Sequence, residues 1–128
     1  SDGDLQNHDN SYGAISDERI KQNIVDAGSQ WDDLKAVKVK KFKFKDAVAN
    51  LGADKATLQI GVVAQDLEAA GMNGLVYEMP DIIDNVDQGT VTKNVKYSVL
   101  YMKAIKALQE AMTRIETLET KVAALESA

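Results

Sequence analysis

The spacing of apolar residues in the first third of the chain predicts two short helical segments. Apolar residues recur at helical spacing after Ser16, which predicts a short helix that ends at Gly28. Ser29 then begins a second helical turn, which carries Trp31 and Leu34.

The next segments follow the two-residue period of β-strands. In residues 37–45 apolar residues alternate with lysines, which predicts a half-buried strand. The alternation changes phase at residues 40–41, where we expect a β-bulge. Residues 46–56 are expected to form a loop or weak turn. Residues 58–63 predict a buried strand in which Gly61 allows another part of the chain to approach closely.

The segment from residue 64 to residue 96 completes a mixed body. Residues 64–70 predict a helix that Gly71 closes. Two short strands are expected at residues 75–79 and 90–96, with a turn at residues 87–89. The predicted fold class is thus α+β, a small mixed domain of short helices and β-strands.

Residues 97–128 predict one long helix that contains no Gly or Pro. Its apolar seam recurs at steps of 4, 3, 4, 3, 3, 4 and 3 residues, the spacing of a coiled coil with one irregularity. A stripe this long and narrow cannot lie wholly on one body of a 128-residue chain, so we expect several chains to pair through it. The seam residues are Tyr101, Ile105, Leu108, Met112, Ile115, Leu118, Val122 and Leu125.

Composition narrows the classes of function. The net charge is −5 and the pI is about 4.8, which argues against a nucleic-acid binder because such a protein needs a basic face. There is no cysteine, which excludes disulfides and cysteine-based zinc sites. No apolar run approaches the roughly 20 residues that span a bilayer, and the N-terminus does not resemble a signal peptide. We expect a soluble protein, intracellular when made, with no cofactor, metal, nucleic-acid or membrane partner.

Residues 11–24, SYGAISDERIKQNI, hold the most informative chemistry. Ser16 lies at a predicted loop-to-helix junction, and Lys21 follows five residues later. Serine is a poor nucleophile until a base takes its proton, and an uncharged lysine can be that base. The single histidine, His8, lies in the polar N-terminal segment, which argues against a Ser-His-Asp triad.

Helix geometry limits how Ser16 and Lys21 can meet. Five residues turn through about 500°, so two mid-helix side chains at this spacing lie roughly 140° apart. If Ser16 is the non-helical N-cap, the long Lys21 side chain can reach its hydroxyl. Free N–H groups at the helix start could then stabilise an oxyanion at the carbonyl of Ile15, the natural target of the Ser16 Oγ atom. The simpler interpretation is a serine that only caps a helix.

Three ordered blocks of residues resemble one known family. They are SDERIKQNI at residues 16–24, IGVVAQ at residues 60–65, and Tyr97 ahead of the long helix. From about residue 11 onward the chain resembles the endosialidase-type intramolecular chaperones. These are C-terminal domains of phage tail fibres, tailspikes and neck appendage proteins.

The resemblance implies a role and a set of site residues. The domain is expected to form a homotrimer, to direct the folding of an upstream β-stalk of the same polypeptide, and then to cut itself off once. The implied scissile bond is Ile15–Ser16, with Ser16 as nucleophile and Lys21 as base. Asp17 would assist by orienting or capping.

The same resemblance divides the chain into three parts. Residues 1–15 are expected to be a linker or the end of the stalk, residues 16–96 the chaperone body, and residues 97–128 a trimeric coiled coil. Folding and cleavage would take place in the host cytoplasm during phage assembly. The domain would leave the virion tail protein on maturation.

Two other functions remain open. A plain trimerisation clamp shares the coiled coil but needs no Ser16. A phosphate- or nucleotide-responsive module would use the one basic cluster, although such alternation is more often the solvated face of an edge strand. Its lysines are Lys35, Lys38, Lys40, Lys41, Lys43 and Lys45.

Two further features are interpreted structurally. Asp81, Asp84 and Asp87 lack the loop of a calcium site, so we interpret them as turn residues. Trp31 is interpreted as a core or interface anchor rather than as a platform for a ligand.

Overall fold

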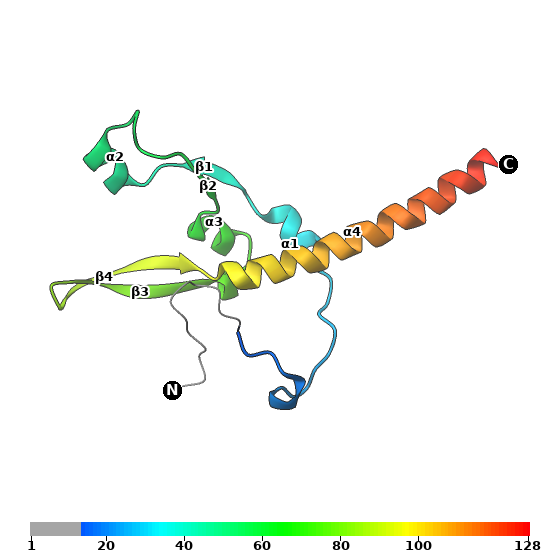
Figure 1. Ribbon diagram of the computed structural model, residues 1–128, viewed down its shortest axis with the longest axis horizontal. Helices are drawn as coiled ribbons and strands as arrows, with labels where there is room; N and C mark the ends of the chain where they lie inside the picture. Colours follow the sequence, from blue (N-terminus) through cyan, green and yellow to red (C-terminus); the bar gives the residue numbers. More distant parts are fainter. Residues whose placement is uncertain (1–13) are drawn as a thin grey trace.

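The computed structural model describes residues 14–128, and most of the smaller elements lie around the N-terminal half of one long helix or beyond its start (Figure 1). His8 and the other predicted linker residues before residue 14 lie outside the described part. The elements in chain order are η1 (Glu18–Ile20), α1 (Trp31–Ala36), β1 (Lys40–Phe42), α2 (Lys45–Leu51), β2 (Gln59–Gly61), α3 (Ala64–Ala69), η2 (Asn73–Leu75), β3 (Val76–Ile83), β4 (Val86–Val95) and α4 (Tyr97–Glu126). Helices and strands are mixed, as the α+β prediction requires.

The hydrophobic core is small and lies where α3 and η2 meet the start of α4. Leu67, Met72, Leu75 and Leu100 form one buried cluster. Gly71 closes α3 with a φ of +83°, as predicted, because glycine adopts this left-handed conformation without strain. The partly buried side chains around the cluster are Val37, Val62, Ala70, Val76 and Val95.

The two strands β3 and β4 form a long antiparallel hairpin. Its turn is at Asp84 and Asn85, whose φ angles are 51° and 65°, so the prediction of a turn at residues 87–89 was wrong. Two residues with positive φ match the right-handed twist of a hairpin, and Asn and Asp tolerate that conformation. Gly89, with a φ of 75°, lies instead where the register shifts opposite Pro80 and Ile82.

The β1–β2 pair departs most from the predicted strands. β1 and β2 are three residues each and pair in a regular antiparallel register, so the predicted bulge at residues 40–41 is absent. The alternation of apolar residues and lysines changes phase because the residues on either side of β1 are not part of a strand. Val37 is the C-cap of α1, and Phe44 is the N-cap of α2. Residues 45–51 form α2, so the prediction of a loop or weak turn over residues 46–56 holds only for residues 52–56.

The predicted close approach at Gly61 is confirmed, and the approaching groups are the side chains of Tyr97 and Phe42. A Cβ atom built on Gly61 would lie 3.2 Å from the Tyr97 hydroxyl and 3.4 Å from Phe42. Glycine is therefore needed where β2 meets the first residue of α4. The strand is not fully buried as predicted, since Ile60 is 74% exposed.

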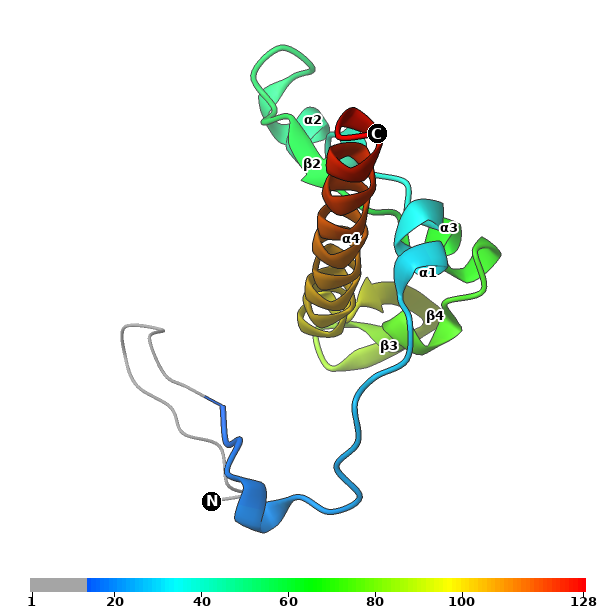
Figure 2. The same cartoon turned by 90° about the vertical axis from the view of Figure 1, so that its right-hand side faces the viewer.

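The helix predicted from Ser16 to Gly28 is wrong. Only the three-residue 3₁₀ turn η1 forms there, and Asn23 has a φ of 57°, which is not helical. Ile20 and Ile24 remain 65% and 64% exposed, so this segment has little packing to hold a helix. Short helices are marginal in water without such packing. We call residues 14–28 the N-terminal arm (Figure 2).

The long helix agrees with the prediction and begins at Tyr97. α4 runs for 30 residues, and its second half projects beyond the rest of the chain (Figure 1). All eight seam side chains are between 46% and 76% exposed. Among residues 14–128, no helix is long and apolar enough to cross a membrane.

Candidate active site

The tight turn of the N-terminal arm brings Ser16 and Lys21 together. Lys21 Nζ donates a hydrogen bond to Ser16 Oγ at 2.6 Å. The geometry differs from the expected N-cap arrangement, because Asp17 is the N-cap of η1 and Lys21 is its C-cap. The backbone N–H of Lys21 donates to the Glu18 carbonyl at 3.1 Å. One 3₁₀ turn therefore achieves the contact that a longer helix was expected to provide.

Asp17 caps the turn and is bound by Arg19, a residue that sequence reasoning missed. The backbone N–H of Arg19 donates to Asp17 Oδ1 at 2.9 Å. Its guanidinium donates from Nη2 to Asp17 Oδ2 at 2.7 Å, and from Nε to both oxygens. The Arg19 side chain, followed by its backbone N–H, holds the pKa of the Asp17 carboxyl below its usual value.

Backbone N–H groups at the start of a helix were expected to stabilise an oxyanion. Three N–H groups of this turn have other partners instead. The N–H groups of Arg19, Ile20 and Lys21 donate to Asp17 or Glu18 within the turn. They are therefore already engaged and are not aimed at the carbonyl of Ile15. The turn brings the Lys21 amine to the Ser16 hydroxyl, while these three N–H groups have partners within the turn.

The site is open to solvent in the single chain. Ser16 and Lys21 are exposed, and the Ile15 side chain is 49% exposed. Figure 2 shows the turn on an extended segment that lies apart from α4. The predicted scissile bond is thus accessible, and no other element of the described chain covers it.

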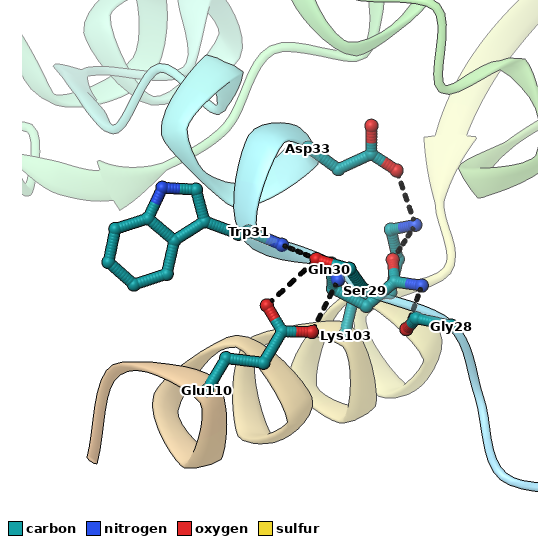
Figure 3. A network of polar contacts seen from close by, with 7 residues as sticks. All are labelled: Gly28, Ser29, Gln30, Trp31, Asp33, Lys103 and Glu110. Carbon is teal, nitrogen blue, oxygen red and sulfur yellow. Dashed lines mark hydrogen bonds and ion pairs between the residues drawn. The ribbon is translucent and has the colours of Figure 1, made fainter. Parts of the chain in front are cut away.

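The far end of the arm is fixed to α4 by polar contacts that we call the α1 clasp (Figure 3). Glu110 Oε2 accepts the hydroxyl of Ser29 at 3.0 Å, and its Oε1 accepts the backbone N–H of Gln30 at 3.0 Å. Lys103 Nζ donates to Gln30 Oε1 at 2.6 Å and to Asp33 Oδ2 at 2.9 Å. The N-terminal half of the short helix α1 is therefore tied to α4.

Trp31 also contacts α4 from this position. The Arg114 guanidinium carbon lies 3.7 Å from the centre of the Trp31 ring, within the range of a cation–π interaction. The groove between α1 and α4 is lined by Trp31, Leu34, Ala104 and Leu108. Trp31 thus anchors α1 to α4, in agreement with its interpretation as an anchor.

The basic cluster is partly engaged within the chain. Lys40 Nζ lies 2.6 Å from Asp66 Oδ2, a buried oxygen with no other hydrogen bond among residues 14–128. Lys43 donates to the carbonyl of Ala53. Lys38 and Lys41 are exposed.

Of the three aspartates interpreted as turn residues, only Asp84 lies in the hairpin turn, because Asp81 belongs to β3 and Asp87 to β4. Thr90 donates to Asp81 Oδ2 at 2.6 Å and Thr92 donates to its other oxygen, and these hydroxyls hold the pKa of the Asp81 carboxyl below its usual value. Asp87 accepts the backbone N–H of Gly89 at 2.8 Å. Within residues 14–128, no three His, Cys, Asp or Glu side chains are placed to hold a metal ion together.

Comparison with known proteins gives three findings. Residues 16–81 match the family model Peptidase_S74, described as chaperone of endosialidase. Over 115 residues, or 88% of the chain, the sequence is 31% identical to a probable tail fiber protein of Escherichia phage Phieco32. The chain spans only 14% of that protein. A crystal structure described as "a novel intramolecular chaperon" shares the fold with a TM-score of 0.61 and 22% identity, covering 77% of this chain and 99% of that one.

The family match covers just over half of the chain and begins at Ser16. It includes two of the three blocks that carried the resemblance, at residues 16–24 and 60–65. The similarity to the tail fiber protein extends over most of the remaining length. The chain therefore belongs to the chaperone-of-endosialidase family, Peptidase_S74, whose name places it among the serine-peptidase-type families.

Proposed function

We propose that this chain is a trimerising intramolecular chaperone that folds an upstream stalk of its own polypeptide and then releases itself by cutting Ile15–Ser16. The observation that carries the proposal is the 2.6 Å contact between Lys21 Nζ and Ser16 Oγ, at the residue where the family match begins. The relative described as a probable tail fiber protein supports a phage fibre as the upstream partner.

The chemistry begins with a proton transfer. When the amine of Lys21 is uncharged, it takes the hydroxyl proton of Ser16. Oγ then bonds to the carbonyl carbon of Ile15, which closes a five-membered ring and places the negative charge on the carbonyl oxygen. Asp17 assists by capping the turn that holds the two groups together.

The intermediate then collapses with the C–N bond breaking. The Ser16 nitrogen takes the proton carried by the Lys21 ammonium, and an ester remains between Ile15 and the Ser16 oxygen. Water hydrolyses this ester, which leaves a carboxylate on Ile15 and a free amine and hydroxyl on Ser16. The reaction occurs once per chain and leaves residues 16–128 as the released fragment.

Trimerisation is proposed to use the α4 seam. Eight apolar side chains at coiled-coil spacing are exposed in the single chain, and the core holds few buried side chains. Each large apolar side chain buried between helices contributes about 1.5–3 kcal/mol, so pairing along the seam is strongly favourable. Residues 97–128 are thus proposed as the coiled coil, and residues 16–96 as the chaperone body.

The chaperone role has a physical basis. Intertwined β-stalks need three chains in register before their non-local contacts form, and loop-closure entropy opposes this. A helical trimer forms from local contacts and raises the effective concentration of the stalks. Removal of the trimer afterwards, in the host cytoplasm, takes away the refolding route and leaves the fibre kinetically trapped.

The proposal is tested in a full-length fibre polypeptide analysed on denaturing gels. Ser16→Ala and Lys21→Ala are expected to keep the C-terminal fragment attached, while the exposed control variants Ser98→Ala and Lys38→Ala are cut as in the wild type. If the wild type itself stays intact after long incubation, the chain acts as a trimerisation clamp without chemistry. Cleavage of both site variants between Ile15 and Ser16 would show that the assigned pair is wrong.

A further inference from the structure

The turn that carries Lys21 also carries two carboxylates. Asp17, Glu18, Arg19 and Lys21 place four charged side chains within five residues. A carboxylate beside an amine favours its charged form, and a charged amine cannot accept a proton. A carboxylate of this turn that is bound to another cation therefore competes less for the lysine amine.

Arg19 provides Asp17 with such a partner. Both carboxylate oxygens of Asp17 accept hydrogen bonds from the Arg19 guanidinium, and Oδ1 also accepts its backbone N–H. Lys21 Nζ bonds to Ser16 Oγ instead, and among residues 14–128 it forms no ion pair. No ion pair or side-chain hydrogen bond links this turn to another described element.

We infer that Arg19 is a positioning residue for the proposed cleavage: it holds the Asp17 carboxylate so that the Lys21 amine faces the Ser16 hydroxyl. The inference rests on the proposed function and adds a residue to it. An arginine suits this role because its planar fork binds both oxygens of a carboxylate and keeps its charge at any pH that the protein meets.

Loss of Arg19 changes which group Lys21 binds. The Asp17 carboxylate then lacks its guanidinium partner, and it competes with Ser16 for the Lys21 ammonium. Because the pair is exposed, solvent weakens this competition, and we expect cleavage at neutral pH to slow roughly three- to tenfold. The pH–rate profile is expected to move to higher pH, since more alkaline solution is needed to uncharge the amine.

The test measures the first-order cleavage rate of the full-length polypeptide from pH 6 to pH 10 on denaturing gels. Arg19→Ala is expected to be slow and to show the shifted profile. Adding Asp17→Asn to Arg19→Ala removes the competing charge but keeps a capping side chain, so it is expected to restore most of the rate and the original profile. Arg19→Lys should be intermediate because it keeps the charge without the fork.

The inference is overturned if Arg19→Ala cleaves at the wild-type rate with an unchanged profile. It is also overturned if the double variant is as slow as Arg19→Ala, because Arg19 would then only hold the turn in shape. Unfolding temperatures within error of the wild type exclude a folding defect. An error in the proposed function itself would give another result, because Ser16→Ala would then still be cut at Ile15–Ser16.

Discussion

The Glu110 carboxylate of α4 accepts the hydroxyl of Ser29 at 3.0 Å, although 81 residues separate the two in the chain. The same carboxylate binds the backbone N–H of Gln30 at the start of α1. The arm that carries the candidate dyad is therefore attached, at its far end, to the helix proposed to join the chains.

Replacing Glu110 tests the α1 clasp. Glu110→Ala leaves the Gln30 N–H and the Ser29 hydroxyl without their acceptor, and loss of such a cap costs about 1–2 kcal/mol of unfolding free energy. Urea unfolding followed by the fluorescence of Trp31, the single tryptophan, measures both stability and the docking of α1. Glu116→Ala is the control, because its carboxylate forms no bond among residues 14–128. Equal stability of the two variants would contradict the role of the clasp.

Replacing Leu108 tests the proposed trimer. Leu108 is 61% exposed in the single chain and lies in the middle of the seam. Leu108→Asp would bury a charge between the paired helices, which is costly, so the variant is expected to sediment as a monomer. Gln109→Asp places the same charge one residue away, outside the seam, and should leave the oligomer intact. A wild-type chain that sediments as a monomer at micromolar concentration would refute the assignment of the seam.

The pair of Lys40 and Asp66 predicts a defined pH dependence. The hydrogen bond from Lys40 lowers the pKa of the Asp66 carboxyl from 3.8. A lowered folded-state pKa stabilises the fold above the unfolded value, and this contribution is lost as the pH falls through the folded value. Wild type should thus unfold at a higher temperature than Asp66→Asn at pH 6, and the difference should shrink below about pH 3.8.

The control for this pair is Asp26→Asn, in the exposed arm. Asp26 forms no ion pair among the described residues, so its replacement should change the unfolding temperature little at either pH. A difference between wild type and Asp66→Asn that stays constant from pH 6 to pH 3 would contradict the assigned role of Lys40.

Local signals in the sequence predicted several elements well. Gly71 closes α3, Gly61 lies where Tyr97 approaches, and α4 begins at Tyr97. These features depend on one residue type or on a long periodic pattern, so they do not depend on which other parts of the chain pack against them. The pairing of Ser16 with Lys21 was also expected, although through a helix that does not form.

The remaining features depend on contacts that a single sequence does not display. The helix expected after Ser16 fails because the chain packs little against Ile20 and Ile24. The turn at Asp84 and Asn85 was placed three residues too late, because Gly89 gives the stronger local signal but lies at a register shift. The α1 clasp joins residues about 80 positions apart, and no spacing rule indicates such a pair.

The central claim concerns where the mature polypeptide ends. The most direct measurement is the intact mass of the denatured fibre polypeptide taken from mature particles. We predict a mass that corresponds to a chain ending at Ile15, with residues 16–128 absent. A mass that includes residues 16–128 would contradict self-cleavage and leave this domain as a permanent clamp of the fibre.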